Sequence, residues 1–144
     1  MKTIIVSGYF DPLHVGHLEM LKLARGLGDE LVVIVNSDVQ AKIKKGRAFM
    51  KEEDRLEIIK SIKYVDAAFI SVDENKTVCK SLRKVKNIYP HHTLVFANGG
   101  DRTEEEIPEA KVCKELKIEM VDGLGRKIRS SSGYTGLKQI WRWV

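Results

Sequence analysis

The chain has 144 residues, 43% of them hydrophobic, and a formal net charge of +5, which suits a single domain over residues 1–144. No apolar run approaches the roughly 20 residues of a membrane helix, and no signal-peptide pattern follows the strand-like start, so we expect a cytoplasmic protein without a membrane partner. Basic residues are not interleaved with aromatic ones, so we expect no nucleic-acid partner either.

Short apolar segments alternate along the chain with segments of helical spacing. The predicted strands are Thr3–Ser7, Glu30–Asn36, Ala67–Val72, Thr93–Ala97 and Ile118–Val121. The predicted helices are Gly16–Gly26, Lys51–Ile62, Thr77–Lys86, Glu104–Leu116 and Ser131–Trp141. Segment 31–35 is apolar on both faces, as is typical of a parallel strand covered by helices on both sides. The pattern predicts an α/β fold: a doubly wound, Rossmann-like parallel sheet of about five strands with helices on both faces.

The segment between the first predicted strand and helix places His14 and His17 three residues apart. A helix N-terminus has unpaired N–H groups and a partial positive charge, so it attracts anions. Both imidazoles can donate hydrogen bonds to one phosphate chain, and Gly16 lets a ligand approach the backbone. A metal site or a structural role is the alternative, but metal ligands more often lie four residues apart and need a third partner. We expect a nucleotide-phosphate site here.

Two short segments carry clustered positive charge. They contain Lys42, Lys44, Lys45 and Arg47, and then Arg126, Lys127 and Arg129. Clusters this short suit a polyphosphate ligand, and a solvated basic face is the alternative. Segment 44–47 is predicted to be a loop. The only cysteines, Cys79 and Cys113, fall in helical segments and are expected to be reduced.

Polar and glycine-rich segments follow four of the predicted strands. These segments are 11–17, 36–38, 98–102 and 122–132. Because ligands of doubly wound sheets bind at the carboxyl ends of the strands, we expect the four segments to form one site.

The order Gly-Tyr-Phe-Asp-Pro-Leu-His-Val-Gly-His at residues 8–17 resembles the signature of the cytidylyltransferase-like nucleotidyltransferases, with its His-x-Gly-His motif. Further blocks agree with that family: Asn36–Asp38, Glu53–Arg55, Gly99–Asp101 and Ser130–Ser132. Within the family, the blocks look most like the adenylyltransferase domain that activates heptose 1-phosphate. Glycerol-3-phosphate cytidylyltransferase is next, and archaeal-type FAD synthetase is similar more loosely.

This resemblance implies direct in-line transfer of a nucleoside monophosphate from a nucleoside triphosphate, with ATP favoured, to a phosphorylated sugar such as heptose 1-phosphate. Pyrophosphate is released. The alternative is CTP with glycerol 3-phosphate or another polyol phosphate. Mg²⁺ is expected to bind mainly through the triphosphate, with Asp11 as the one alternative for a protein ligand. We also expect a homodimer.

The resemblance also implies roles for individual residues. The catalytic residues are His14, His17 and Lys45, with Lys42 or Lys44 as alternatives to Lys45. The nucleotide-binding residues are Tyr9, Phe10, His14, Gly16, His17, Gly99, Asp101, Arg129, Ser130, Ser131 and Ser132. The substrate-binding residues are Asp11, Lys45, Arg55 and Asp101. The alternatives are ordinary structural roles: a solvent-facing Arg55, a turn at Asp101 and a helix cap formed by the serines.

Two classes of function other than an enzyme agree less well with the sequence. A nucleotide sensor without turnover conflicts with the presence of both histidines, Lys45, Arg55 and Asp101. A tRNA-directed protein would need an anticodon-binding domain, for which 144 residues leave no room.

Overall fold

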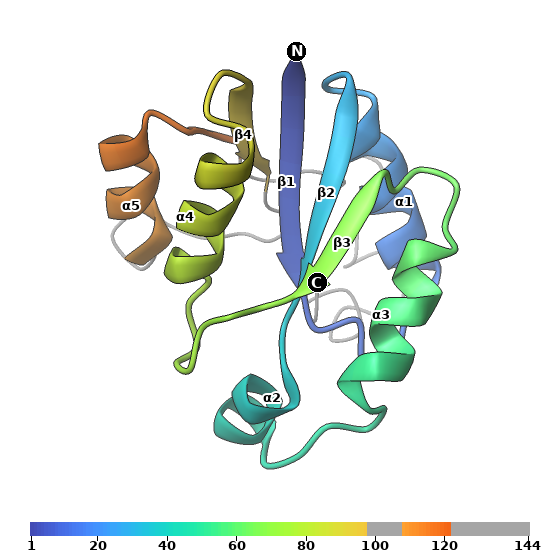
Figure 1. Cartoon of the computed structure of the whole chain (residues 1–144). Helices are drawn as coiled ribbons and strands as arrows, with labels where there is room; N and C mark the ends of the chain where they lie inside the picture. The colour runs from blue at the N-terminus through green and yellow to red at the C-terminus, as the bar shows by residue number, and fades with distance from the viewer. Residues whose placement is uncertain (98–107, 122–144) are drawn as a thin grey trace, which may run out of the picture.

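The computed structural model of the protein describes residues 1–97 and 108–121. Strands and helices alternate along these residues (Figure 1). The strands are β1 (Lys2–Gly8), β2 (Glu30–Val35), β3 (Ala67–Ile70), β4 (Thr93–Ala97) and β5 (Glu119–Val121). The helices are α1 (Val15–Arg25), α2 (Asp38–Lys45), α3 (Glu52–Lys60), α4 (Cys79–Ile88) and α5 (Pro108–Leu116).

The five described strands form one parallel sheet in the order β3-β2-β1-β4-β5. Ile4 of β1 lies opposite Leu31 of β2 on one side and Val95 of β4 on the other. The chain therefore builds outward from β1 to β3 and then returns to add β4 on the opposite side. The order reverses between β1 and β4, which is where doubly wound sheets open a crevice for ligands. The predicted five-stranded parallel sheet is confirmed.

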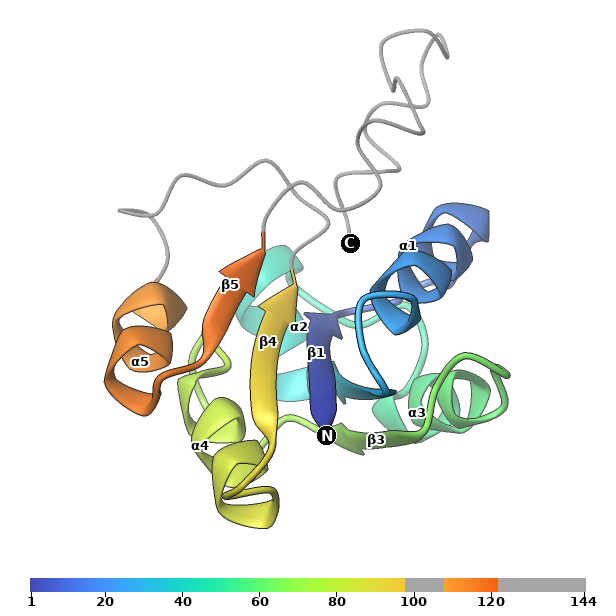
Figure 2. The same cartoon turned by 90° about the horizontal axis from the view of Figure 1, so that it is seen from above.

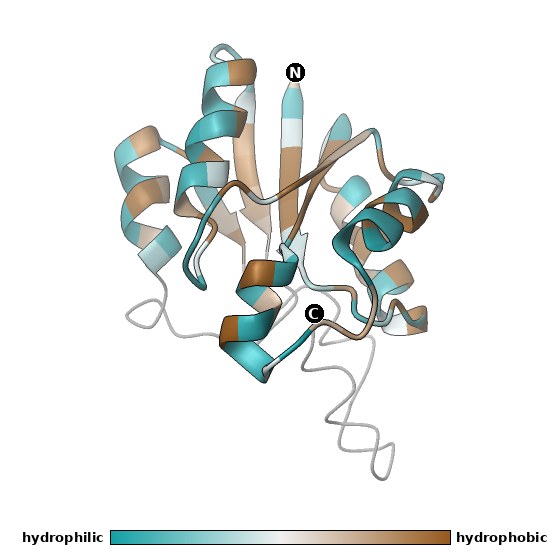
Figure 3. Ribbon diagram, turned by 60° about the horizontal axis from the view of Figure 1, so that its bottom comes forward, coloured by the Kyte–Doolittle hydropathy of each residue, from teal (hydrophilic) through white to brown (hydrophobic). Residues whose placement is uncertain are grey.

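Helices cover both faces of the sheet, as predicted (Figure 2). Alternate residues of a strand point to opposite faces, so Ile4 and Val6 pack with α1 and α3 while Ile5 packs with α4 and α5. Figure 3 shows hydrophobic residues running along the strands between the two helical layers. All residues of segment 31–35 are buried, because each face of β2 is covered.

The segment 38–45 is helical, and the prediction of a loop over 44–47 is wrong for its first two residues. The side chain of Ser37 caps α2 by accepting from Gln40 N at 3.2 Å, while Ser37 N donates to Gln40 Oε1 at 2.9 Å. Gly46 ends the helix with φ of 91°. Only Gln40 and Ala41 are buried in α2. Because so few of its residues are buried, the sequence of α2 shows no apolar pattern of helical spacing. Figure 1 shows α2 beyond the carboxyl ends of β1 and β2.

The other predicted helices differ from the structure only at their ends, by one or two residues where both ends are described. Residues 104–107 of one predicted helix and the whole of predicted helix 131–141 lie outside the described residues. Cys79 and Cys113 are free thiols, and burial raises the pKa of Cys113 to about 12. No helix within residues 1–97 and 108–121 is long and apolar enough to cross a membrane.

Candidate active site

The connection from β1 to α1 is shaped by Phe10. Its backbone has φ of 52°, and its buried ring lies against Gly8, where a Cβ atom would come within 2.9 Å of the ring. The same ring contacts the His17 ring edge to face, with 5.1 Å between centroids. The Phe10 side chain thus fixes the turn and supports His17, and the expected contact of Phe10 with nucleotide stays a prediction.

His14 and His17 form the first turn of α1 together. His14 is the N-cap, and its Nδ1 accepts from Gly16 N at 3.1 Å. Its own backbone N–H donates to Nδ1 of His17 at 3.0 Å, and the two rings lie 3.8 Å apart. Because each Nδ1 accepts a hydrogen bond, each neutral ring carries its proton on Nε2. The sequence prediction that both imidazoles act as donors from one helix start fits this arrangement.

The Nε2 atom of His17 has no hydrogen-bond partner among the described residues, although the side chain is 0% exposed. Burial, with a smaller contribution from His14, lowers the pKa of His17 to about 3. The ring is therefore neutral at physiological pH, and its Nε2–H is a donor. An unpaired buried donor costs about 1–3 kcal/mol, so its presence at a helix N-terminus points to a ligand that supplies an acceptor, such as a phosphate oxygen.

Asp11 lies between this turn and the chain that follows α2. Its buried carboxylate accepts from Phe49 N at 2.7 Å, from Met50 N at 2.6 Å and from Lys45 Nζ at 2.8 Å. Burial favours the protonated acid, but the hydrogen bonds from Lys45, Phe49 and Met50 outweigh it and lower the pKa of Asp11. Asp11 and Lys45, both expected to bind substrate, are thus paired with each other in this structure.

Arg55 is 1% exposed, so the alternative of a solvent-facing side chain is wrong. Its guanidinium donates to the carbonyl oxygens of Tyr9 at 2.8 Å, Asn36 at 2.7 Å and Met50 at 2.9 Å. It also pairs with Asp38 at 2.6 Å. The resemblance implies that Arg55 donates hydrogen bonds to a bound phosphate. The geometry shows a buried cation that joins the segments after β1, after β2 and after α2.

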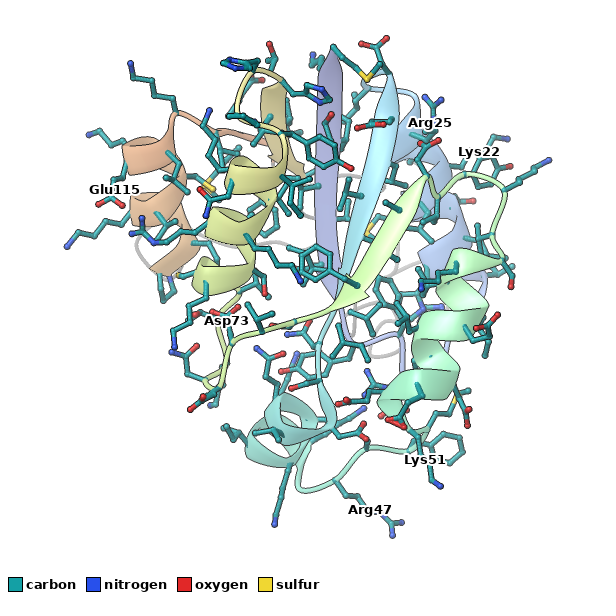
Figure 4. All side chains as sticks on the ribbon, in the orientation of Figure 1. Lys22, Arg25, Arg47, Lys51, Asp73 and Glu115 are labelled. Atoms are coloured by element: carbon teal, nitrogen blue, oxygen red, sulfur yellow. The ribbon has the colours of Figure 1, made fainter. Side chains whose placement is uncertain are left out.

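A cavity of about 550 Å³ opens beside these segments. It is lined by Tyr9, Asp11, Pro12, Lys44, Lys45, Arg47 and Phe49. The Lys44 ammonium lies 4.6 Å from the centre of the Tyr9 ring, and that of Lys45 lies 5.8 Å from it. Figure 4 shows Arg47 and Lys51 projecting outward from the segment between α2 and α3. Lys44, Lys45 and Arg47 of the basic cluster therefore border a pocket, whereas Lys42 does not.

Phe49 is the site residue that the sequence pattern missed. It is 75% exposed and lines the cavity. The only signal was a lone aromatic residue in a basic segment, which by itself predicts nothing. The expected nucleotide ligands Gly99, Asp101, Arg129, Ser130, Ser131 and Ser132 lie outside the described residues. The structure therefore brings the cavity next to the first turn of α1, residues 14–17, which we call the phosphate turn because we expect it to bind phosphate. The other half of the predicted site remains a prediction.

Comparisons with known proteins agree with this geometry. The cytidylyltransferase-like family model matches residues 5–132. The chain is 48% identical over 115 residues to FAD synthase of Pyrococcus horikoshii, covering 79% of this chain and 68% of that protein. It is 34% identical over 125 residues to the bifunctional protein HldE of Aliarcobacter butzleri, covering 85% of this chain but 25% of that protein.

A solved structure shows the same fold. The lipopolysaccharide core biosynthesis protein from Thermoplasma volcanium superposes with a TM-score of 0.66 at 27% identity, covering 85% of this chain and 95% of that one. The motif blocks placed the heptose enzymes nearest, but identity is higher to the FAD synthase of Pyrococcus horikoshii than to HldE of Aliarcobacter butzleri. The chain belongs to the cytidylyltransferase-like family, and it is a nucleotidyltransferase.

Proposed function

We propose that the protein transfers the adenylyl group of ATP to FMN, forming FAD and releasing pyrophosphate. The observation that carries the phosphate chemistry is the buried, unpaired Nε2–H of His17 at the N-terminus of α1. The acceptor is inferred from the 48% identity to an FAD synthase over 79% of this chain. FAD consists of AMP joined to FMN through a pyrophosphate bridge, so its synthesis is a nucleotidyl transfer to a phosphate monoester.

The reaction needs little beyond alignment and charge stabilisation. A phosphate oxygen of FMN is nucleophilic at neutral pH and attacks the α-phosphorus of ATP in line. The new P–O bond forms as the bond from the α-phosphorus to the bridging β-oxygen breaks, and pyrophosphate leaves with that electron pair. His17 would donate its Nε2–H to an α-phosphate oxygen, where negative charge grows. Lys45 would exchange Asp11 for the leaving pyrophosphate.

Magnesium would enter with the triphosphate and supply charge neutralisation on its oxygens. Asp11 is the buried carboxylate nearest the phosphate turn along the chain, and it already accepts three hydrogen bonds. No group of three His, Cys, Asp or Glu side chains within residues 1–97 and 108–121 could hold a metal ion.

A sugar 1-phosphate is the second candidate acceptor, with ATP as donor. Its support is the 34% identity to HldE of Aliarcobacter butzleri over 85% of this chain, together with the structure of the protein from Thermoplasma volcanium. The motif blocks also leave CTP with glycerol 3-phosphate as a third combination to test.

A pyrophosphate-release screen distinguishes these combinations. The full chain, with Mg²⁺, is given ATP, CTP, GTP or UTP and, in turn, FMN, heptose 1-phosphate or glycerol 3-phosphate. We expect the highest kcat/KM with ATP and FMN, with FAD identified by chromatography. A higher kcat/KM with a sugar phosphate or glycerol phosphate would show that this compound, and not FMN, is the acceptor. It would not contradict nucleotidyl transfer. Release of pyrophosphate without an acceptor is the control for hydrolysis.

A further inference from the structure

We infer that the cavity between Tyr9 and Phe49 is the binding site for the flat isoalloxazine ring of the acceptor. This inference rests on the proposed function and deepens it, because it assigns the part of the acceptor that does not react to named side chains.

The cavity lies next to the phosphate turn without being part of it. Its lining includes Asp11 and Pro12 but neither His14 nor His17. The two places are thus separated by a few residues of one short loop, so a ligand that fills the cavity can extend a flexible arm toward His17. FMN has this form: a ring system joined to its phosphate by a ribityl chain. The volume of about 550 Å³ lies within the usual range for small-molecule sites.

The lining suits an aromatic ring better than a sugar. Tyr9 and Phe49 present rings, and Lys44 already uses the Tyr9 ring as a cation–π partner at 4.6 Å. Sugar hydroxyls could accept from the basic side chains of the lining, but as donors they would also need acceptors. The Asp11 carboxylate of the lining is already engaged by Lys45 and two backbone N–H groups. A flavin stacked beside Tyr9 would displace the Lys44 ammonium, which would then be placed for the flavin phosphate.

Phe49 is held in position by the same residue that borders the phosphate turn. Asp11 accepts the backbone N–H groups of Phe49 and Met50, which fixes the chain just where the Phe49 side chain begins. Phe49 is 75% exposed, so the fold gains little from its ring. The Phe49 ring is thus exposed at the rim of a cavity, and the backbone that carries it is held by a buried carboxylate. This arrangement suits contact with a ligand.

The test compares Phe49→Ala with Phe49→Trp, which keeps a ring, and with Ile43→Ala, which removes an exposed apolar side chain of α2 outside the cavity lining. Binding of FMN without ATP is followed by quenching of flavin fluorescence, and turnover is followed by FAD formation. Loss of one stacking partner is expected to raise the FMN Kd and KM about tenfold in Phe49→Ala, with the ATP KM unchanged. Ile43→Ala is expected to stay within about twofold of wild type in both assays, and Phe49→Trp is expected to recover most of the FMN affinity that Phe49→Ala loses.

The outcomes separate this inference from the proposed function. FAD formation by the wild type with an unchanged FMN KM in Phe49→Ala would overturn the ring site and leave the function intact. An equal rise in the ATP and FMN KM values would also overturn it, because it would show a general disturbance of the site. A third outcome is that the wild type quenches flavin fluorescence, Phe49→Ala quenches it less, and the wild type forms no FAD with any nucleotide. This outcome would support the ring site and overturn the proposed reaction. Neither quenching nor FAD formation by the wild type would overturn both, whereas FAD formation without any change of flavin fluorescence would overturn the ring site alone.

Discussion

His17 is held by its Nδ1, which accepts from His14 N, so that its Nε2–H is free to act on a ligand. His17→Ala should lower kcat by about two orders of magnitude, as expected for the loss of one donor to transition-state charge. His17→Asn is the matched variant, because an amide oxygen can replace Nδ1 as acceptor while Nε2–H is lost. We expect equal loss of kcat in both, measured by pyrophosphate release, and a smaller loss of Tm in His17→Asn. A folded variant with near-wild-type kcat would contradict the role of His17.

The depressed pKa of His17 predicts how stability changes with pH. The folded pKa is about 3, below the ordinary value of 6.5. Between these values the unfolded state binds more protons, so this contribution is present above pH 6.5 and is lost as the pH falls toward 3. The unfolding free energy should fall by about 1.4 kcal/mol per pH unit at the steepest.

The measurement is urea unfolding between pH 6.5 and 4.5, above the range where Asp11 takes up a proton. The difference between the wild type and His17→Asn isolates His17 from the other histidines. A parallel pH dependence of the two proteins would show that His17 is not the group responsible. Over the same range kcat should show no titration of His17, since the ring is already neutral.

For single residues, the sequence predicts the roles that depend on spacing along the chain. It does not predict the roles that depend on partners far away in the chain. The pair His14 and His17 could be identified because both lie on one helical turn. The burial of Arg55 could not, because the carbonyl groups that accept from it come from residues up to 46 positions away. Phe49 has no periodic partner, and only the hydrogen bond from its backbone N–H to Asp11 shows what holds the chain where its side chain begins.

Helix α2 carries the lysine that the family resemblance assigns to catalysis. Lys45→Ala should lower kcat more than it raises the ATP KM, if the ammonium leaves Asp11 for the phosphates only as charge develops. Lys42→Ala is the matched control, since Lys42 also lies in the last turn of α2 but does not line the cavity. A silent Lys45→Ala beside a damaging Lys42→Ala or Lys44→Ala would show that another lysine has this role.

Helix α3 contributes Arg55, which joins three segments, so its replacement tests structure against phosphate binding. Arg55→Leu leaves the carbonyl oxygens of Tyr9, Asn36 and Met50 without their donor and should destabilise the fold by about 3–5 kcal/mol. Urea unfolding measures this loss. A variant with unchanged stability but a raised KM for ATP or FMN would instead support direct contact with phosphate. Arg25→Leu, which removes a half-exposed ion pair with Asp66, is the control and should cost far less.

Among the elements, the sequence predicts those that bury apolar residues in a regular pattern. β2 was found because its apolar run is continuous, and α3 because its apolar residues recur at helical spacing. α2 was missed because its stability comes from the Ser37 capping box and from Gln40, which reaches the backbone of residues 75 and 77. Hydrogen bonds of this kind leave no apolar pattern to detect.

Over the whole molecule, the alternation of strands and helices was enough to predict a parallel sheet, but not its strand order. The order decides which segments meet, and it places the phosphate turn after β1 next to the end of β4. The acceptor could not be predicted from the motif blocks, because they describe how phosphates are held. The cavity beside the turn depends on α2 and Phe49, which the sequence pattern missed. The expected homodimer stays a prediction for sedimentation analysis.

Two neighbouring but separate sites predict that the two substrates stabilise the protein independently. A non-hydrolysable ATP analogue with Mg²⁺ is expected to bind at the turn that contains His17, and FMN is expected to bind in the cavity lined by Tyr9 and Phe49. Each ligand should raise Tm, because a ligand that binds only the folded state adds about 2.7 kcal/mol at one hundred times its Kd. The two shifts should add within error, and the CTP analogue should give a smaller shift than the ATP analogue. His17→Asn should lose mainly the nucleotide shift and Phe49→Ala mainly the flavin shift. If the Tm with both ligands is no higher than the Tm with the better ligand alone, FMN and ATP compete for one site, because one site holds only one ligand at a time.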